Sequence, residues 1–256
     1  MRKTLPILLG LLVLPALSRA ETPLDPKALM EAVFDKGAWK DMKGQITLTL
    51  QNKRGDRKER SIEMWSRDNE AGEASILMRF VAPADVKGTA FLQIENTGKD
   101  DDRRLYLPAL RRVQRITSSG TGGNFMASDF TFYDIGRPKI EDWNFSFGKG
   151  DEKCATVVIG EAARDQVIRD TGYSRIVWCV NARDFMIVSA DYYDKDQEHF
   201  KTLKARKVEI IGNAPFTTDM LMQNLITKHR SEMVFSQLRT NTGIADSAFN
   251  ERALRQ

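Results

Sequence analysis

Apolar and polar residues alternate with a period of two along most of the chain, beginning at Gln45. Ile46, Leu48 and Leu50 alternate with polar residues, which is typical of a strand with one buried face. The same alternation, or a short apolar run between turn residues, indicates further strands at 62–64, 74–80, 90–94, 105–107, 111–116, 143–147, 154–160, 173–180, 186–192, 203–211, 220–226 and 233–235. About ten or more strands joined by short polar turns predict a mainly β fold with one large antiparallel sheet, wet on one face and dry on the other.

Two helical segments accompany the predicted strands. Asp25 is a favourable N-cap, Pro26 suits the first helical position, and Gly37 predicts the end of the helix. A second amphipathic turn or helix is expected at 245–254. Because so wide a sheet curls, two helices cannot cover its dry face, and another segment or a ligand should cover the rest. Trp65 falls on the opposite face from its neighbours, which the alternation does not explain.

Residues 125–135, FMASDFTFYDI, interrupt the strand pattern, and we call them the central segment. The segment is too broken for a regular strand and too apolar for a solvated loop, because Ser128, Asp129 and Asp134 stand among aromatic residues. We interpret it as a plug or gate laid against an apolar surface formed by the rest of the chain. Nothing in it resembles reaction chemistry, so it favours a binding protein over an enzyme.

Residues 1–20 have the features of a signal peptide. A basic start with Arg2 and Lys3 precedes an apolar run, and Ala20 ends a small-residue cleavage site. We expect cleavage after Ala20, export, and a single mature domain at 21–256. Removing Arg2, Lys3 and Arg19 changes 39 basic residues against 35 acidic ones to 36 against 35, so the net charge falls from +4 to +1. So small a net charge argues against nucleic acid as a partner.

The two cysteines, Cys154 and Cys179, fit an oxidising compartment. They flank a predicted hairpin with strands near 154–160 and 173–180 and a polar loop between them. Symmetric pairing about that loop places residue 160 opposite 173 and Cys154 opposite Cys179, which is close enough for a disulfide. Two free buried cysteines are the alternative.

Motifs for catalysis, metal binding or a cofactor are missing from the sequence. His199 and His229 have no cysteine or carboxylate at metal-ligand spacing beside them, and we expect both at the surface or a sheet edge. The acidic run at 99–102 lacks the spacing of a calcium loop and is expected to be a solvated hairpin tip. The Gly-rich loop at 118–123 lacks the ending of a phosphate-binding loop. Without a nucleophile elbow or a Ser/His/Asp set, we expect no active site, no metal and no cofactor.

Apolar residues on the dry face are the candidates for a binding surface, although each is core by default. The candidates are Leu29, Met30, Val33, Phe34, Met64, Met78, Phe80, Phe91, Leu105, Leu107, Phe125, Met126 and Phe130. Ten methionines, several of them on strand faces, indicate an adaptable surface. Arginines crowd the two strands around Pro108, where a solvated outer face is one explanation. A docking face for anionic lipid head groups or an acidic partner, formed by Arg111, Arg112 and Arg115, is the other.

Three blocks of the sequence resemble the signature blocks of one protein family. They are PADVKGTAFL at 83–92, YLPALRRVQRI at 106–116 and FMASDFTFYDI at 125–135, and they occur in that family's order. The chain thus resembles the LolA-like outer-membrane lipoprotein-sorting proteins over essentially its whole mature length. One departure is Ala127, at a position where the third block is expected to have glycine.

The resemblance implies a periplasmic protein with a half-open antiparallel β-barrel and a helical lid around an apolar cavity. Its implied role is to carry the acyl chains of lipoproteins or lipids from an inner-membrane exporter to an outer-membrane acceptor, as a monomer. We expect residues 25–36 and 125–135 to form the lid. The alternative is a sensory or regulatory module of the same fold that reports mislocalised lipid to a membrane protein partner. A lipid-modifying enzyme is a third possibility.

Overall fold

The computed structural model of the chain describes residues 25–35 and 38–256. The predicted signal peptide with its cleavage point after Ala20, and the predicted helix end at Lys36 and Gly37, lie outside the described residues. Within the described ranges, no helix combines the length and the apolar character that spanning a bilayer requires.

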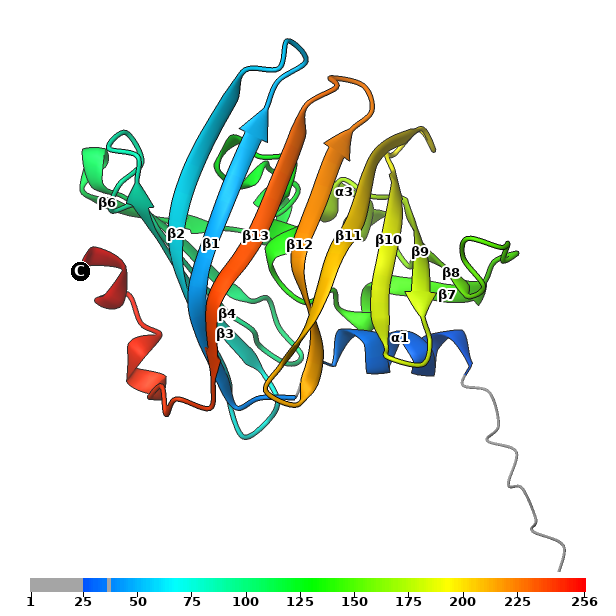
Figure 1. Cartoon of the computed structure of the whole chain (residues 1–256), viewed down its shortest axis with the longest axis horizontal. Coiled ribbons are helices and arrows are strands. Elements are labelled where there is room, and N and C mark those ends of the chain that lie inside the picture. The colour runs from blue at the N-terminus through cyan, green and yellow to red at the C-terminus, as the bar shows by residue number, and fades with distance from the viewer. Residues whose placement is uncertain (1–24, 36–37) are drawn as a thin grey trace, which may run out of the picture.

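Thirteen antiparallel strands of the described residues form one curled sheet, in the order β6-β5-β4-β3-β2-β1-β13-β12-β11-β10-β9-β8-β7 (Figure 1). The strands are β1 (Asp41–Gln51), β2 (Arg57–Asp68), β3 (Ala74–Ala82), β4 (Ala90–Ile94), β5 (Asp102–Leu107), β6 (Arg112–Ile116), β7 (Trp143–Phe147), β8 (Val157–Ala162), β9 (Arg175–Asn181), β10 (Met186–Tyr193), β11 (His199–Ile211), β12 (Ala214–Asn224) and β13 (Arg230–Thr240). The edge strands β6 and β7 do not pair with each other, so the barrel stays open. The predicted mainly β fold with a half-open antiparallel barrel is confirmed.

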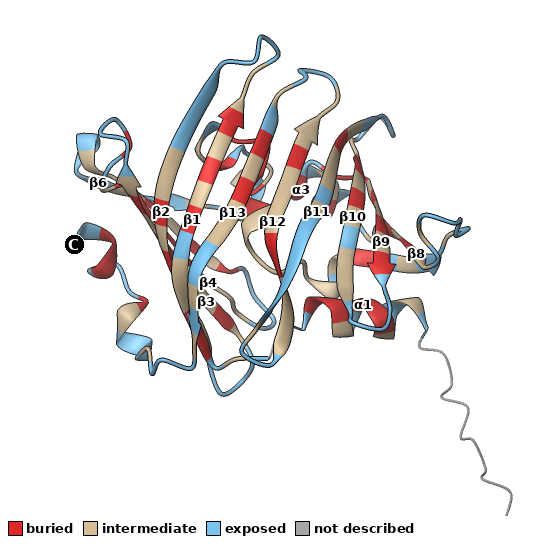
Figure 2. Ribbon diagram, viewed as in Figure 1, coloured by how far each residue is buried: buried red, intermediate tan, exposed pale blue. Residues whose placement is uncertain are grey.

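In the middle of the sheet, the first strand of the described chain pairs with the last one. Strand β1 pairs with β2 on one side and with β13 on the other, so that Ile46 lies between Ile62 and Phe235. Buried and more exposed residues alternate along these strands, as Figure 2 shows. Leu48 and Met64, which follow the same alternation, are almost fully buried. The period of two in the sequence therefore identifies the dry face correctly.

Three α-helices accompany the sheet in the described residues: α1 (Pro26–Phe34), α2 (Phe132–Ile135) and α3 (Asp165–Thr171). The Asp25 carboxylate accepts a hydrogen bond from the Ala28 N–H at 2.9 Å, and Pro26 opens α1 as predicted. The apolar stripe of this helix is buried. Phe34 packs edge-on against Trp178 of β9, with the ring centroids 5.8 Å apart. Helix α1 thus crosses the open side of the curled sheet at its β7–β10 end (Figure 1).

A second, smaller core lies on the other face of β3–β5 and explains Trp65. The C-terminal turns η5 (Asp246–Ala248) and η6 (Ala253–Arg255) bring Phe249 and Leu254 onto this face. There the two residues contact Leu77 of β3 in a cluster against which Trp65 packs. The Asp41 carboxylate fastens the start of this segment, because it accepts hydrogen bonds from the backbone of residues 242–244 at 2.7–3.3 Å. The predicted C-terminal amphipathic turn is confirmed.

The disulfide Cys154–Cys179 is formed, with a Cα–Cα distance of 5.8 Å, and its prediction is confirmed. The predicted register of the hairpin around it is wrong. Val157 lies opposite Cys179 and Gly160 opposite Ile176, whereas residue 160 was expected opposite 173. The connection is not a polar loop, because its middle forms α3. Residues that face each other have numbers that add to 336 instead of the expected 333, so the register differs from the predicted one by three residues. Cys154 precedes β8 and reaches Cys179 from beyond the end of the ladder.

Candidate functional site

An apolar cavity of about 300 Å³ lies between the concave face of the sheet, α1 and the chain from 130 to 138. Five of the candidate residues from the sequence line it: Val33, Phe34, Met64, Met78 and Phe130. Its size lies at the lower end of the range of small-molecule sites, and its lining is mainly aliphatic and aromatic. Such a lining suits a hydrocarbon chain, which binds through buried area and needs few directional bonds.

Methionine is the most distinctive component of this lining. Seven of the chain's ten methionines border the cavity: Met42, Met64, Met78, Met186, Met220, Met222 and Met233. They come from β1, β2, β3, β10, β12 and β13, so they surround the hollow instead of forming one patch. Unbranched thioether side chains adapt to ligands of different shape. The adaptable surface suggested by the methionine content therefore has a defined location.

The remaining candidates do not line the cavity. Leu29, Met30, Phe80, Phe91, Leu105 and Phe125 are buried in the packed core, and Leu107 and Met126 pack partly buried against it. Phe125 lies at the centre of an aromatic cluster, with its ring centroid 5.5–6.0 Å from those of Phe80, Phe91 and Phe132. For these residues the default explanation, core packing, fits the structure.

Several cavity residues were missed from the sequence. They include Trp39, Ile76, Trp178, Tyr192, Leu203, Phe216 and Phe235. All of them except Trp39, which precedes β1, lie in β3 or in β9–β13, where the alternation places them on the concave face. The signal for these residues was therefore present in the sequence. What the sequence did not show is which strands face the hollow and which face the packed core.

The central segment is fixed to the sheet by a first buried polar cluster around Asp129, which is 6% exposed. One oxygen of its carboxylate accepts a hydrogen bond from Ser231 Oγ at 2.7 Å and lies 2.7 Å from His229 Nδ1. The Asp129 N–H donates to Ser231 Oγ at 2.8 Å. His229 is therefore only in part a surface residue, since its ring reaches inward to a buried carboxylate.

A second buried cluster fixes the end of the central segment. Lys201 of β11 is 2% exposed, and its Nζ lies 2.9 Å from Asp134 Oδ2 and 3.1 Å from the carbonyl oxygen of Asp129. Tyr173 donates to Asp134 at 2.9 Å and also contacts the Lys201 amine. Burial, with the Asp134 carboxylate nearby, raises the pKa of Tyr173 well above its ordinary value, so the phenol keeps its proton and donates. The predicted plug is thus held by hydrogen bonds as well as by apolar contacts.

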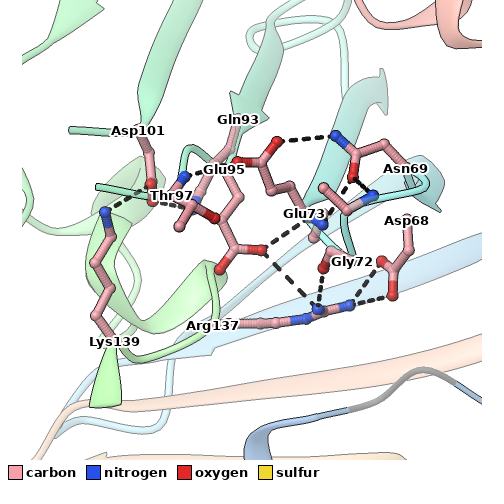
Figure 3. Close-up of polar contacts among 12 residues, drawn as sticks. Asp68, Asn69, Gly72, Glu73, Gln93, Glu95, Thr97, Asp101, Arg137 and Lys139 are labelled. Atoms are coloured by element: carbon pink, nitrogen blue, oxygen red, sulfur yellow. Dashed lines mark hydrogen bonds and ion pairs between the residues drawn. The ribbon is translucent and has the colours of Figure 1, made fainter. Parts of the chain in front are cut away.

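The chain just after the central segment is fastened to two hairpins at the rim of the cavity (Figure 3). Arg137 donates to both carboxylate oxygens of Asp68 at 2.6 Å and to the Gly72 carbonyl at 3.0 Å. Lys139 Nζ lies 3.1 Å from Asp101 Oδ1. Nη2 of the guanidinium binds the Asp68 carboxylate and Nη1 binds the Gly72 carbonyl, so the planar group is held at two points and Arg137 sets the position of this rim.

The acidic run at 99–102 is not the fully solvated hairpin tip that the sequence suggested. Asp101 is 3% exposed and pairs with Arg103 at 2.6 Å as well as with Lys139. Asp102 pairs with Arg104 at 2.8 Å. The prediction was wrong because the partners that bury these carboxylates include a residue from a distant part of the chain.

Comparison with known proteins places this fold in a family. A model of a family described as an uncharacterized protein matches residues 72–256, and the chain belongs to that family. A domain from Vibrio parahaemolyticus named for outer-membrane lipoprotein sorting is 28% identical with a TM-score of 0.80, over 89% of this chain and 98% of that one. A DUF1329 family protein from Desulfovibrio piger is 27% identical with a TM-score of 0.81, over 90% and 100%. A LolA superfamily protein from Nitrosomonas europaea shares the fold at 15% identity, with a TM-score of 0.71 over 90% of this chain and 100% of that one. The fold of this chain is LolA-like. Among curated protein sequences, none matches the chain.

The departure of this LolA-like chain from the expected third block has a structural meaning. Ala127 has φ +59° and follows Met126 at φ +49°, so two consecutive residues adopt the left-handed conformation. A side chain with a Cβ is strained there, which is why glycine suits the position. Within the described residues, the other two blocks form the turn into β4 and the β5–β6 hairpin at the sheet edge.

Proposed function

We propose that this LolA-like protein binds the acyl chains of lipids or lipoproteins in the apolar cavity and carries them through water towards the outer membrane. The methionine-rich cavity is the observation that carries the proposal. A sixteen-carbon chain exposed to water forfeits about 0.8 kcal/mol per CH₂, or roughly 12 kcal/mol in total. An apolar hollow recovers much of this free energy, and release remains feasible because few directional bonds must break.

The two parts of the predicted lid have different roles in this proposal. The central segment is the fixed floor of the cavity, because Asp129 and Asp134 hold it to the sheet by buried hydrogen bonds. Helix α1 is the movable cover. The contacts that it makes with the sheet in the described residues are apolar side-chain contacts, made by the stripe that includes Val33 and Phe34. Such contacts can be exchanged for similar contacts with a hydrocarbon chain.

Displacement of a fluorescent fatty-acyl probe tests the cavity. Met220→Glu places a carboxylate in the lining, and Met126→Glu makes the same change at a partly buried methionine outside the cavity. Because an unpaired charge in an apolar site is costly, Met220→Glu should weaken probe binding by about tenfold or more. Met126→Glu should leave the affinity near that of the wild type. Equal affinities for all three proteins, with folding verified by circular dichroism, would remove the cavity from the proposal.

Transfer of the cargo requires a donor and an acceptor, and we assign the docking of an acidic partner to the edge strand β6. Arg111, Arg112 and Arg115 are exposed at this edge. Arg104, opposite Arg115, is already paired with Asp102. Arg112→Glu with Arg115→Glu should slow lipid transfer between donor and acceptor vesicles carrying the partner proteins while leaving probe affinity unchanged. Binding without any transfer in the wild type would instead favour a sensor.

Export to the periplasm is part of the same proposal. The predicted cleavage after Ala20 is tested by N-terminal sequencing of protein purified from its native host. A mature chain that begins at Glu21 is expected, and an intact Met1 would contradict export by this route.

A further inference from the structure

A second, polar cavity of about 180 Å³ adjoins the apolar one. Its walls come from the β4–β5 hairpin tip, the loop at 118–121, the chain from 133 to 142, and α3. The loop lies directly on α3, since the Gly122 N–H donates to the Asp170 carbonyl at 2.6 Å. A Cβ on Gly122 would lie 2.9 Å from the backbone of Thr171, so glycine is required for this close approach. The cavity is therefore a built feature of the fold.

Two side chains, Tyr133 and Arg137, line both cavities and form the boundary between them. Tyr133 is held in place by Trp143, whose Nε1–H donates to the phenol oxygen at 2.9 Å. Arg137 is held by Asp68 at the rim (Figure 3). An apolar chamber and a polar chamber that meet at two fixed side chains match the two ends of an amphiphile.

The charges in the polar cavity balance. It is lined by four carboxylates and four cations: Asp100, Asp101, Asp142, Asp170, Arg103, Arg137, Lys139 and Arg164. The cations are already paired, among them Arg164 with Asp142 at 2.8 Å and Lys139 with Asp101 at 3.1 Å. A phosphate or sulfate would meet these carboxylates without gaining a free cation. A neutral group with hydroxyls avoids this repulsion, and it can donate to carboxylates and accept from guanidinium groups.

Arg103 supplies the unpaired donor that such a group requires. The residue is 6% exposed, and its Nη2 donates to Asp101 at 2.6 Å. Its buried Nε–H has no hydrogen-bond partner among the described residues. A buried donor without a partner costs free energy, and a ligand oxygen would recover this cost once the Arg103 side chain turns its Nε–H towards the cavity that it lines. The Asp142 carboxylate is also partly removed from water, since burial raises its pKa despite the neighbouring Arg164 guanidinium.

We propose that the polar cavity binds the neutral, hydroxyl-rich head group, of the sugar or glycerol class, of an amphiphile whose chain lies in the apolar cavity. The inference rests on the proposed function, because the tail must occupy the first cavity. It narrows the cargo to amphiphiles with an uncharged polar head.

Compounds with the same twelve-carbon tail and different heads test this inference. Dodecyl maltoside and dodecylphosphocholine, each below its critical micelle concentration, and dodecanol below its solubility limit compete with the fluorescent acyl probe for the full mature chain. Because the sugar head adds hydrogen bonds to charged groups, dodecyl maltoside should displace the probe at about one-tenth of the dodecanol concentration. Maltose, which has no tail, tests whether a free sugar binds by itself, and it should not displace the probe at these concentrations.

Two variants connect the preference to the polar cavity. Arg103→Lys keeps a cation for Asp101 and removes the Nε–H, while Gln166→Trp on exposed helix surface fills the cavity without touching the core. Both should reduce the advantage of dodecyl maltoside over dodecanol to about twofold or less, with dodecanol affinity unchanged. Should Arg103→Lys fail to fold, Gln166→Trp alone decides the question.

The outcomes separate the two proposals. Probe displacement by none of the three dodecyl compounds would overturn the proposed function itself. Four outcomes would overturn only the head-group inference. They are equal displacement by dodecyl maltoside and dodecanol, strongest displacement by dodecylphosphocholine, displacement by maltose alone, and an unchanged preference of Gln166→Trp for dodecyl maltoside over dodecanol.

Discussion

Replacing Lys201 by methionine measures how firmly the central segment is held. The substitution keeps the length of the side chain and its apolar stem, and it removes the ammonium that contacts Asp134, the Asp129 carbonyl and Tyr173. Breaking a buried ion pair by removing one partner costs about 3–5 kcal/mol. Asp134 retains two other donors, the Thr131 N–H at 2.8 Å and the Tyr173 hydroxyl, so the lower end applies. We expect a loss of about 3 kcal/mol, or roughly a hundredfold in the unfolding equilibrium.

Urea unfolding at pH 7, followed by circular dichroism and by tryptophan fluorescence, gives this number. Lys204→Met is the matched control, because Lys204 is an exposed lysine of the same strand, and a change within about 0.5 kcal/mol is expected for it. The double variant Lys201→Met with Asp134→Asn should lose less than the sum of the single variants, since the two residues interact directly. A loss below about 1 kcal/mol for Lys201→Met would refute the buried anchor, because it would show the ammonium to be solvated or dispensable.

Three further predictions concern stability. Ala127→Gly should raise the unfolding free energy by about 0.5–1 kcal/mol, because glycine relieves the strain at φ +59°; a decrease in urea unfolding would contradict this explanation. Replacing Cys154 and Cys179 by serine should cost about 3.5 kcal/mol by the chain-entropy model for a separation of 25 residues, and an unchanged urea midpoint would show that the crosslink contributes nothing. Asp41→Asn should cost about 2 kcal/mol at pH 7, because the carboxylate accepts hydrogen bonds from the backbone of residues 242–244. Burial alone would raise the pKa of Asp41, but these hydrogen bonds hold the pKa below 3.8. The stability advantage of the wild type over Asp41→Asn should therefore be full above about pH 5 and disappear as the pH falls through 3.8 to the folded-state pKa. A stability difference that does not change between pH 7 and pH 3 would contradict this.

The sheet could be predicted from the sequence because one face of each strand meets water and the other does not. Ile46 and Leu48 follow this rule without exception. Strand β3 does not, since Leu77 is buried beneath the C-terminal turns while Met78 is buried on the concave side. Strand β3 is buried on both faces because the C-terminal turns, far away along the chain, cover its second face. The local pattern of apolar and polar residues cannot predict this contact. The outward position of Trp65 could not be explained from the sequence for the same reason, because Trp65 packs against the same C-terminal cluster.

The buried anchors were visible in the sequence only as exceptions. Lys201 has the same phase in β11 as Leu203 and Ala205, and Ser231 has the phase of Met233 in β13. A polar residue on the dry side of a strand requires a buried partner, and this signal could have been read. The identity of the partner could not be read, because Asp134 lies 67 positions from Lys201 and Asp129 lies 102 from Ser231.

The methionines around the cavity also make its chemistry vulnerable. Oxidation converts a thioether to a sulfoxide, which is polar and requires a hydrogen-bond partner. Seven such sulfur atoms border one hollow, so a hypochlorite- or peroxide-rich environment would turn an oily interior into a hydrophilic one, residue by residue. The proposed binding of a hydrocarbon chain would be lost while the β-ladders remained intact. Repair would then depend on enzymes that reduce the sulfoxides, and not on new synthesis of the chain.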